Sequence, residues 1–388
     1  MRISIVAIIC FQLLACAASR RTMDVSIQRV IDSVQARVAP DKRTLLFEII
    51  ADHGILKGET SSAAAKDALL QRLNAAGIRY IDSISVLPAS TAGGRRHGVV
   101  TISVANLRTQ PSHKAELASQ ATMGTPLHLL KRQRGWYLVQ TPDRYIAWID
   151  AGAVEAMEAA RATDWANKPK LIFTGMHGLV FGDTINHEVL TDLAFGNLVE
   201  YFALTPRFVQ LRLPDGRTGF ATNSDFMPYT EWRQSRSPLA ANLVSSAKQL
   251  MGLPYLWGGT SVRGVDCSGF TRTVFLMNGL LLPRDASQQV LLGTEIDTAG
   301  GWSALQPGDL LFFGSRAQPG KPEQVVHVGL WVGNQSFIHA SGKVQLASLD
   351  PSASDYDAVE HRRFLRVKRI NASDALLDLR KTDIFFEW

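Results

Sequence analysis

One cysteine, Cys267, is the residue of this 388-residue sequence best suited to covalent chemistry. The other two cysteines, Cys10 and Cys16, lie in an apolar N-terminal stretch that resembles an export leader. An exported protein that keeps a single cysteine in its body cannot use it for an internal disulfide. Cys267 is therefore a buried filler, a metal ligand or a nucleophile.

The segments on either side of Cys267 favour the nucleophile. A glycine-rich loop ends at Gly258-Gly259, and the apolar run Gly269–Met277 predicts a buried helix. Cys267 is thus expected at or just before a helix N-terminus, where the helix dipole and unpaired amides lower the pKa of a thiol. The same amides can stabilise an oxyanion.

Two histidines further along the chain can supply the base. The segment Gln324–Ser341 predicts two strands around a Gly-Asn turn. With a loop at Val332–Asn334, His327 lies opposite His339, and their even separation places both on one face. One imidazole can then take the thiol proton while the other fixes its tautomer. Taken alone, either histidine is more simply a core or surface residue.

Residues 239–368 resemble an NlpC/P60 cysteine peptidase domain. The matching motifs, in the order and spacing of that family, are Leu253–Gly259, Asp266–Phe270, Leu282–Gln289, Leu305–Phe313 and the two histidine strands. The resemblance implies a papain-like α+β fold that cleaves peptidoglycan stem peptides or muropeptides, commonly between D-γ-glutamyl and the diamino acid. No cofactor or metal is expected.

The resemblance also implies a role for each matched residue. Cys267 is the nucleophile, His327 the base and His339 the residue that orients it. Tyr255 is expected to help form the oxyanion site, with its phenol donating alongside the Cys267 amide. A packing aromatic is the simpler interpretation of Tyr255, and the two interpretations are compatible.

The composition describes a folded chain of several modules. At 388 residues and 46% hydrophobic content, the chain can hold two to four modules, each with its own core. The net charge of +6 and the pI of about 9.3 are mildly basic, and the charge is spread out. Nucleic acid is therefore not indicated as a partner, and weak attraction to an anionic wall or membrane surface is the most that the charge supports.

Residues 1–16 are predicted to be a secretory leader, because the apolar run Ile3–Ala15 is too short to span a bilayer. Leu13-Leu14-Ala15-Cys16 resembles a bacterial lipobox, which implies acylation of Cys16 and a lipid anchor to the membrane. Ordinary cleavage after Ala15-Cys16-Ala17 is the alternative. The expected location is the periplasm or cell envelope.

Residues 24–97 are predicted to form an α/β segment that serves as scaffold. Its expected elements are an amphipathic helix at Ile27–Val38, a strand at Leu45–Ile50, a helix at Thr60–Ala76 and a strand at Ile78–Leu87.

Residues 98–153 resemble a bacterial SH3 barrel, and residues 170–228 fit a second, more diverged one. Strands of the first barrel are expected at Val99–Val104, Pro126–Lys131, Gly135–Gln140 and Arg144–Ile149. Residues 154–169 between the barrels are predicted to be a helical connector. The predicted fold class is therefore multidomain α+β: an N-terminal α/β segment, two SH3-like β-barrels and a C-terminal papain-like NlpC/P60 domain.

Two SH3 barrels before an NlpC/P60 domain resemble the γ-D-glutamyl-L-diamino acid endopeptidases, in which the first barrel closes the groove so that the substrate begins with a free L-Ala amine. An ammonium in a closed pocket needs carboxylates or π-faces. The expected partners are Asp266, Glu116 and Tyr145. By the same resemblance, the groove is lined by Trp257, Ser268 and Ser287. A solvated surface charge remains the alternative for Glu116, and a core position for Trp257.

Three other functions stay open. The protein could be a wall-binding protein without activity, although intact Cys267, His327 and His339 argue against that. It could be a general hydrolase of intact peptidoglycan, or a metalloenzyme that uses the same three residues. The sequence lacks a His-Glu-x-x-His pattern, so the metal interpretation is weakly supported.

Overall fold

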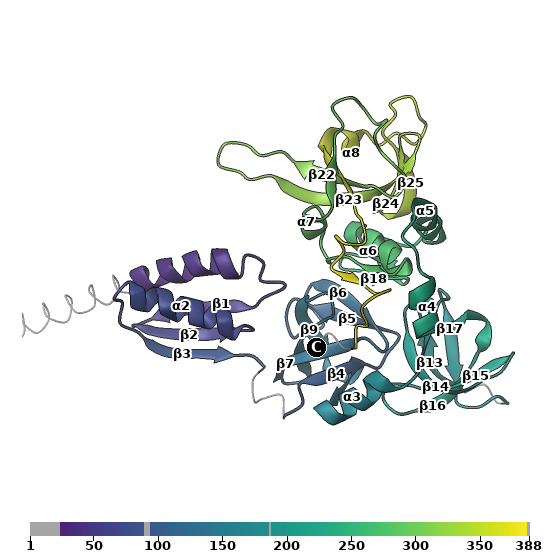
Figure 1. The fold of residues 1–388 in the computed structure, drawn as a ribbon, viewed down its shortest axis with the longest axis horizontal. Coiled ribbons are helices and arrows are strands. Elements are labelled where there is room, and N and C mark those ends of the chain that lie inside the picture. Colours follow the sequence, from purple (N-terminus) through teal and green to yellow (C-terminus); the bar gives the residue numbers. More distant parts are fainter. Residues whose placement is uncertain (1–23, 89–93, 186–187, 386–388) are drawn as a thin grey trace, which may run out of the picture. The chain divides into compact units, whose positions relative to one another are not determined.

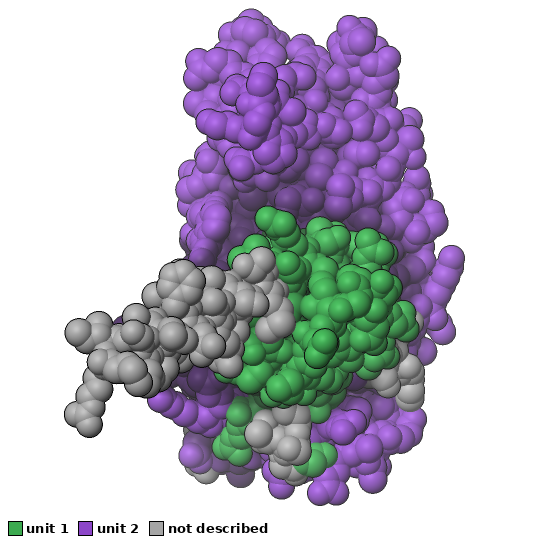
Figure 2. Space-filling model, turned by 90° about the vertical axis from the view of Figure 1, so that its left-hand side faces the viewer, with its two compact units in different colours: residues 1–94, 129–132, 144–146 green, residues 95–128, 133–143, 147–388 purple. Residues whose placement is uncertain are grey.

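The computed structural model describes residues 24–88, 94–185 and 188–385 (Figure 1). The predicted leader and Cys16 lie outside these residues. The chain divides into two compact units (Figure 2): residues 1–94 with the short segments 129–132 and 144–146, and the remainder. No helix of the described residues is both long and apolar enough to cross a membrane.

The first unit contains a small α/β sandwich. A helix over residues 24–38 and α2 (Ala63–Ala75) share one core with a three-stranded sheet, β1 (Phe47–Asp52), β2 (Ile55–Thr60) and β3 (Ile81–Val86). The fully buried side chains of this core come from both helices and the middle strand: Ile27, Ile31, Leu56, Leu69 and Leu73. Ser62 caps α2 by accepting a hydrogen bond from the Ala65 N–H at 3.2 Å.

The middle strand of this sheet is not among the strands predicted from the sequence. His53 and Gly54 both have positive φ, 53° and 75°, which gives the two-residue turn that joins β1 to β2. β2 then pairs with β1 antiparallel and with β3 parallel, so α2 is a crossover between parallel strands.

The first strand-rich region forms a seven-stranded sheet in the order β10-β4-β7-β8-β9-β5-β6. Its strands are β4 (His97–Val100), β5 (Val104–Arg108), β6 (Leu117–Thr122), β7 (Pro126–Gln133), β8 (Trp136–Gln140), β9 (Ile146–Asp150) and β10 (Val154–Met157). The expected single strand Val99–Val104 was wrong. The chain bends between Val100 and Val104, so that β4 pairs with β7 and β10 while β5 pairs with β6 and β9.

The predicted helical connector at residues 154–169 is only partly helical. β10 occupies its first four residues because these pair with β4, and α3 (Ala159–Asn167) follows. The second strand-rich region is also a seven-stranded sheet, in the order β13-β12-β16-β15-β14-β11-β17. Its strands are β11 (Lys170–Phe173), β12 (Gly178–Phe181), β13 (Val189–Leu193), β14 (Leu198–Leu204), β15 (Phe208–Arg212), β16 (Thr218–Thr222) and β17 (Phe226–Pro228).

The C-terminal region is built on a six-stranded sheet in the order β21-β26-β22-β23-β24-β25 (Figure 1). The strands are β21 (Thr294–Ile296), β26 (Phe364–Arg369), β22 (Leu310–Ser315), β23 (Gln324–Gly333), β24 (Ser336–Ser341) and β25 (Lys343–Ser348). The helices around it are α4 (Tyr229–Ser235), α5 (Ala240–Gln249), α6 (Cys267–Met277), α7 (Ala286–Gln289) and α8 (Ala358–Arg363). Phe270 and Val274 of α6 share a core with Val328 and Ile338 of the sheet, which fixes α6 against β23 and β24.

The first strand-rich region meets the C-terminal region through backbone groups. Gly258 has a φ of +80°, and a Cβ added there would lie 2.2 Å from the Leu117 carbonyl oxygen on β6. Nearby, the Thr260 N–H donates to the Gln120 side chain and the Gln120 N–H donates to the Thr260 hydroxyl, both at 3.1 Å. Only glycine allows this close approach at position 258, so the glycine-rich loop packs directly against the backbone of β6.

We therefore expect Gly258→Ala to lower the melting temperature of the full chain by more than a glycine-to-alanine change that introduces backbone strain alone. The matched control is Gly252→Ala, where φ is +82° but an added Cβ would meet nothing within 4 Å. The control carries only the left-handed strain of about 1–2 kcal/mol, whereas Gly258→Ala adds an overpacking cost of about 1–3 kcal/mol. Equal melting temperatures in calorimetry would contradict this account of the loop.

Candidate active site

Cys267 is the first residue of α6, as the sequence predicts. Its side chain is buried at 8% exposure, and it is a free cysteine. The preceding residue, Asp266, caps the helix by accepting the Gly269 N–H at 2.7 Å. The backbone N–H groups of Val328 and Ser268 reach the sulfur and stabilise its thiolate form. Since Val328 directly follows His327 on β23, the thiol lies beside the strand that carries the predicted base.

The expectation of a lowered thiol pKa was wrong. Burial raises the pKa of Cys267 to about 12, and the neighbouring Asp266 carboxylate raises it further. The two backbone amides and the Arg284 guanidinium act in the opposite direction and are outweighed. At neutral pH the resting enzyme therefore holds a protonated thiol.

His327 and His339 are in direct contact: Nε2 of His327 lies 2.9 Å from Nδ1 of His339. The predicted register was off by two residues. The chain turns at Asn334 and Gln335, both with positive φ, so Trp331 pairs with Phe337 rather than with Gln335. The two histidines are consequently diagonal neighbours on one face instead of direct opposites. A shift of two residues preserves the face, which is why the predicted contact survives the error.

Both imidazoles are held neutral. Burial lowers the pKa of His327 to about 3, with the His339 and Arg363 charges lowering it further. Burial likewise lowers the pKa of His339 to about 4, and the Asp357 carboxylate opposes this. If His327 accepts the thiol proton on Nδ1, its Nε2 must carry a proton and donate to His339. The Nε2 of His339 then bears the last proton, at an atom that is buried without a hydrogen-bond partner among the described residues.

Tyr255 lies near the thiol and remains protonated. Its backbone bridges to Val265 and its N–H donates to the Gly342 carbonyl at 3.0 Å. Burial, with the charges of Cys267 and Asp266, raises the pKa of Tyr255 to about 12. A phenol that stays neutral can donate a hydrogen bond at any working pH.

Asp266 is held by a buried arginine to which the sequence analysis gave no role. Arg284, 2% exposed, donates to the two carboxylate oxygens of Asp266 at 2.5 and 3.2 Å, and to the Ser268 hydroxyl at 3.0 Å. The Gly258 N–H donates to the same carboxylate at 3.0 Å. Together with the helix cap, these contacts use the full accepting capacity of the carboxylate. Arg284 also donates through Nε to the Ala118 carbonyl of β6 at 3.1 Å.

Glu116, from the first strand-rich region, reaches the same loop. The Trp257 indole N–H donates to Glu116 Oε1 at 2.6 Å. Trp257 is 62% exposed, which excludes the alternative of a core position. Consecutive residues of the loop thus hold two carboxylates, since Trp257 contacts Glu116 and Gly258 contacts Asp266.

The remaining predicted groove residues differ in their settings. Ser268 is buried and bonded to Asp266 and Arg284, whereas Ser287 is exposed on α7. Tyr145 is buried and belongs to the first compact unit, so its substrate role stays a prediction. Within the described residues, no three His, Cys, Asp or Glu side chains are placed to hold a metal ion.

Gln289 is a second residue without a role in the sequence analysis. It is fully buried, accepts from Thr271, and donates to the carbonyls of Ser268 and Pro283. It therefore joins α6 to the loop before α7. Both Arg284 and Gln289 lie in the matched motif Leu282–Gln289, which is the signal that could have pointed to them.

Comparisons with known proteins agree with this geometry. The NlpC/P60 family model matches residues 252–363, and the model of the bacterial dipeptidyl-peptidase SH3 domain matches residues 107–154. The chain is 42% identical over 115 residues to the probable endopeptidase NlpC of Escherichia coli, covering 28% of this chain and 68% of that protein. The chain therefore belongs to the NlpC/P60 family of cysteine peptidases.

A longer match takes in the first strand-rich region. The chain is 25% identical over 261 residues to a γ-D-glutamyl-L-lysine dipeptidyl-peptidase of Bacillus cereus, covering 64% of this chain and 76% of that protein. A crystal structure of an NlpC/P60 family protein from Bacillus cereus superposes on 70% of this chain and 99% of its own, with a TM-score of 0.60 at 21% identity. The predicted multidomain α+β fold with SH3-like and NlpC/P60 domains is confirmed.

The protonated thiol has a measurable consequence. Below a pKa of about 12, the thiolate fraction rises with every step in pH, so alkylation of the native protein by iodoacetamide should accelerate throughout pH 7–10. In urea, where the protein is unfolded, the alkylation rate of the same cysteine should stop rising once the pH exceeds the ordinary thiol pKa of about 8.5. The measurement is the alkylation rate by mass spectrometry. A native rate that is already constant at neutral pH would show a resting thiolate–imidazolium pair and overturn the assignment.

Proposed function

We propose that this protein is a cell-envelope cysteine peptidase that hydrolyses the γ-D-glutamyl–diamino acid bond of peptidoglycan stem peptides. The observation that carries the proposal is the free thiol of Cys267 at the N-terminus of α6, beside the strand of the His327–His339 pair. The names of the relatives support the substrate class: one is a γ-D-glutamyl-L-lysine dipeptidyl-peptidase and another a probable peptidoglycan endopeptidase. Residues 1–16 as a leader and Cys16 as an acylation site stay predictions.

In the proposed mechanism, proton transfer accompanies attack. The Cys267 sulfur attacks the glutamyl carbonyl carbon while its proton passes to Nδ1 of His327, and His339 holds the imidazole in place. The Tyr255 phenol and the Cys267 backbone N–H donate to the developing oxyanion. His327 then gives its proton to the leaving amine as the C–N bond breaks. Water, activated by the same imidazole, hydrolyses the thioester and restores the thiol.

The free N-terminal amine of L-Ala is proposed to bind beside Trp257 and Gly258. Asp266 is already neutralised by Arg284, so Glu116 is the carboxylate that can still accept a hydrogen bond from the amine. Its Oε2 has no hydrogen-bond partner among the described residues. An ammonium there would add a charge-assisted hydrogen bond to Glu116.

Hydrolysis of L-Ala-γ-D-Glu-diaminopimelate tests the proposed function. Cys267→Ala and His327→Ala should each abolish product formation measured by mass spectrometry. His339→Ala should retain measurable activity and His339→Asn or His339→Gln more, because an orienting group contributes less than a nucleophile or base and an amide can take its place. Near-normal turnover by Cys267→Ala would end the cysteine-peptidase proposal.

The N-acetylated form of the same peptide tests recognition of the amine. Acetylation removes the charge and adds bulk, so wild-type kcat/KM should fall at least tenfold, equal to about 1.4 kcal/mol. Glu116→Gln should lower kcat/KM about fivefold for the free peptide and leave the acetylated one unchanged, a modest effect because Glu116 is exposed.

Glu158→Gln is the matched control, since Glu158 is also exposed and makes no side-chain cap bond. It should leave both peptides unaffected. Equal cleavage of free and acetylated peptides by the wild type would instead favour a general hydrolase of intact peptidoglycan.

A further inference from the structure

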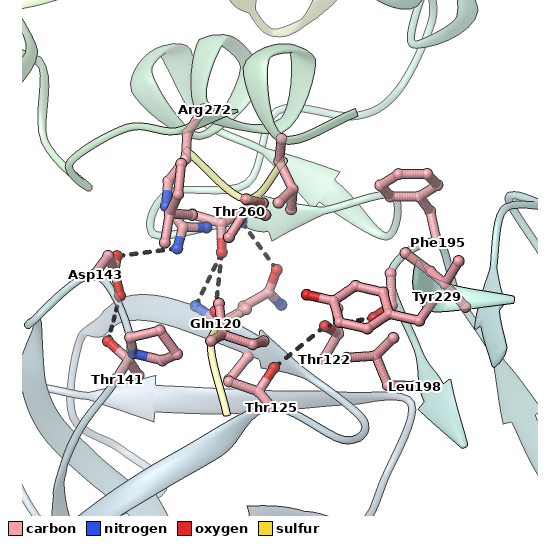
Figure 3. Close-up of a pocket in the computed structure, with 18 of the residues that line it drawn as sticks. Gln120, Thr122, Thr125, Thr141, Asp143, Phe195, Leu198, Tyr229, Thr260 and Arg272 are labelled. Atoms are coloured by element: carbon pink, nitrogen blue, oxygen red, sulfur yellow. Dashed lines mark hydrogen bonds and ion pairs between the residues drawn. The ribbon is translucent and has the colours of Figure 1, made fainter. Parts of the chain in front are cut away.

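A cavity with about 90 Å³ of open volume lies inside the second unit (Figure 3), and Cys267 is not among the residues that line it. Its walls come from the first strand-rich region, the second strand-rich region, α4, α6 and the C-terminal segment. Most lining side chains are apolar, among them Ile172, Phe195, Leu198, Leu276 and Leu281. The volume suffices for several water molecules, each of which needs two to four polar partners when it is buried.

Eight of the nineteen lining residues carry polar side chains, and most of these are already paired. Arg272 of α6 forms an ion pair with Asp143 at 3.0 Å, and Asp143 also accepts from Thr141. Gln120 and Thr260 bond to one another, as Figure 3 shows. The ion pair is nearly closed to solvent, with side-chain exposures of 11% for Arg272 and 2% for Asp143. The cavity therefore has no net charge to offer a charged ligand.

Two hydrogen-bonding atoms on the cavity residues are left without partners. The Tyr229 side chain is 5% exposed, its hydroxyl points into the cavity (Figure 3), and it has no hydrogen bond among the described residues. The Nε–H of Arg272 is buried and also lacks a partner there. Burial, with the Asp383 charge, raises the pKa of Tyr229, so its phenol stays protonated. Buried donors without partners are costly unless a bound molecule accepts from them.

We propose that this cavity is a binding site for a small uncharged molecule with an apolar part and a hydrogen-bond-accepting oxygen, the class of short amides. Such a molecule places its apolar part against the leucine and phenylalanine wall. Its oxygen accepts from the Tyr229 hydroxyl. The site is separate from the thiol, although α6 contributes to both, since Cys267 begins the helix and Arg272 follows one and a half turns later.

Isobutyramide is a suitable probe, with isobutyrate and isobutylammonium as charged analogues of the same shape. Titration of the full chain, followed by ligand-observed NMR, should show saturable binding of isobutyramide and weaker binding of both charged analogues. Tyr229→Phe keeps the ring and removes only the hydroxyl, and it should weaken isobutyramide binding about five- to tenfold.

Cys267→Ala is the control that separates this cavity from the active site, and it should bind isobutyramide as the wild type does. Three results would overturn the proposal: no saturable binding by the wild type, unchanged affinity in Tyr229→Phe, or loss of binding in Cys267→Ala. Binding of isobutyrate as tight as that of the amide would overturn the assignment of an uncharged ligand.

Discussion

The buried ion pair of Asp266 and Arg284 is the interaction on which the geometry around Cys267 depends. Asp266 caps α6, binds the Gly258 N–H of the glycine-rich loop, and receives both terminal nitrogens of Arg284. Removing one partner would leave a buried charge uncompensated, which typically costs about 3–5 kcal/mol. Replacing Asp266 would therefore displace the helix terminus and the loop together, and the carboxylate has a structural task before any contact with substrate.

The same ion pair connects the catalytic region to the first strand-rich region. Arg284 donates to the Ala118 carbonyl through its remaining Nε, while Gln120 and Thr260 exchange hydrogen bonds across 140 residues of sequence. Since these bonds use backbone groups and buried amides, their geometry leaves little freedom to β6 and the loop. Glu116 precedes β6 directly and is thereby held beside Trp257. If Glu116 binds the substrate amine as proposed, such fixed contacts are needed to position the module that supplies it.

The sequence predicts this site unevenly, for physical reasons. The start of α6 at Cys267 follows from local signals, namely a capping Asp266 before an apolar helical run. The contact of His327 with His339 follows from the alternation of side chains along strands. Misplacing the turn by one residue shifts the pairing register by two residues, and a shift of two keeps both histidines on the same face. The strand after His53 was missed because its turn depends on a non-glycine residue at positive φ. Arg284 lies in a matched motif but its partners could not be predicted, since its contacts with Ser268, Asp266 and Ala118 span 16 to 166 residues and arise from tertiary packing.

Burial also constrains the proposed chemistry. A thiol with a raised pKa and two imidazoles with lowered pKa values share one desolvated site, so the ion pair of thiolate and imidazolium is disfavoured at rest. In the proposed mechanism, charge separation becomes favourable when the new negative charge moves onto a substrate oxygen, where the Tyr255 phenol and the Cys267 N–H are proposed to donate to it. The hydrogen bonds that stabilise the charge would then form in the transition state and not in the resting enzyme. Interactions made only in the transition state raise kcat, whereas interactions made equally in the ground state only tighten binding. A buried neutral thiol also reacts slowly with small electrophiles, so the desolvation that delays ionisation protects the nucleophile until a peptide occupies the groove.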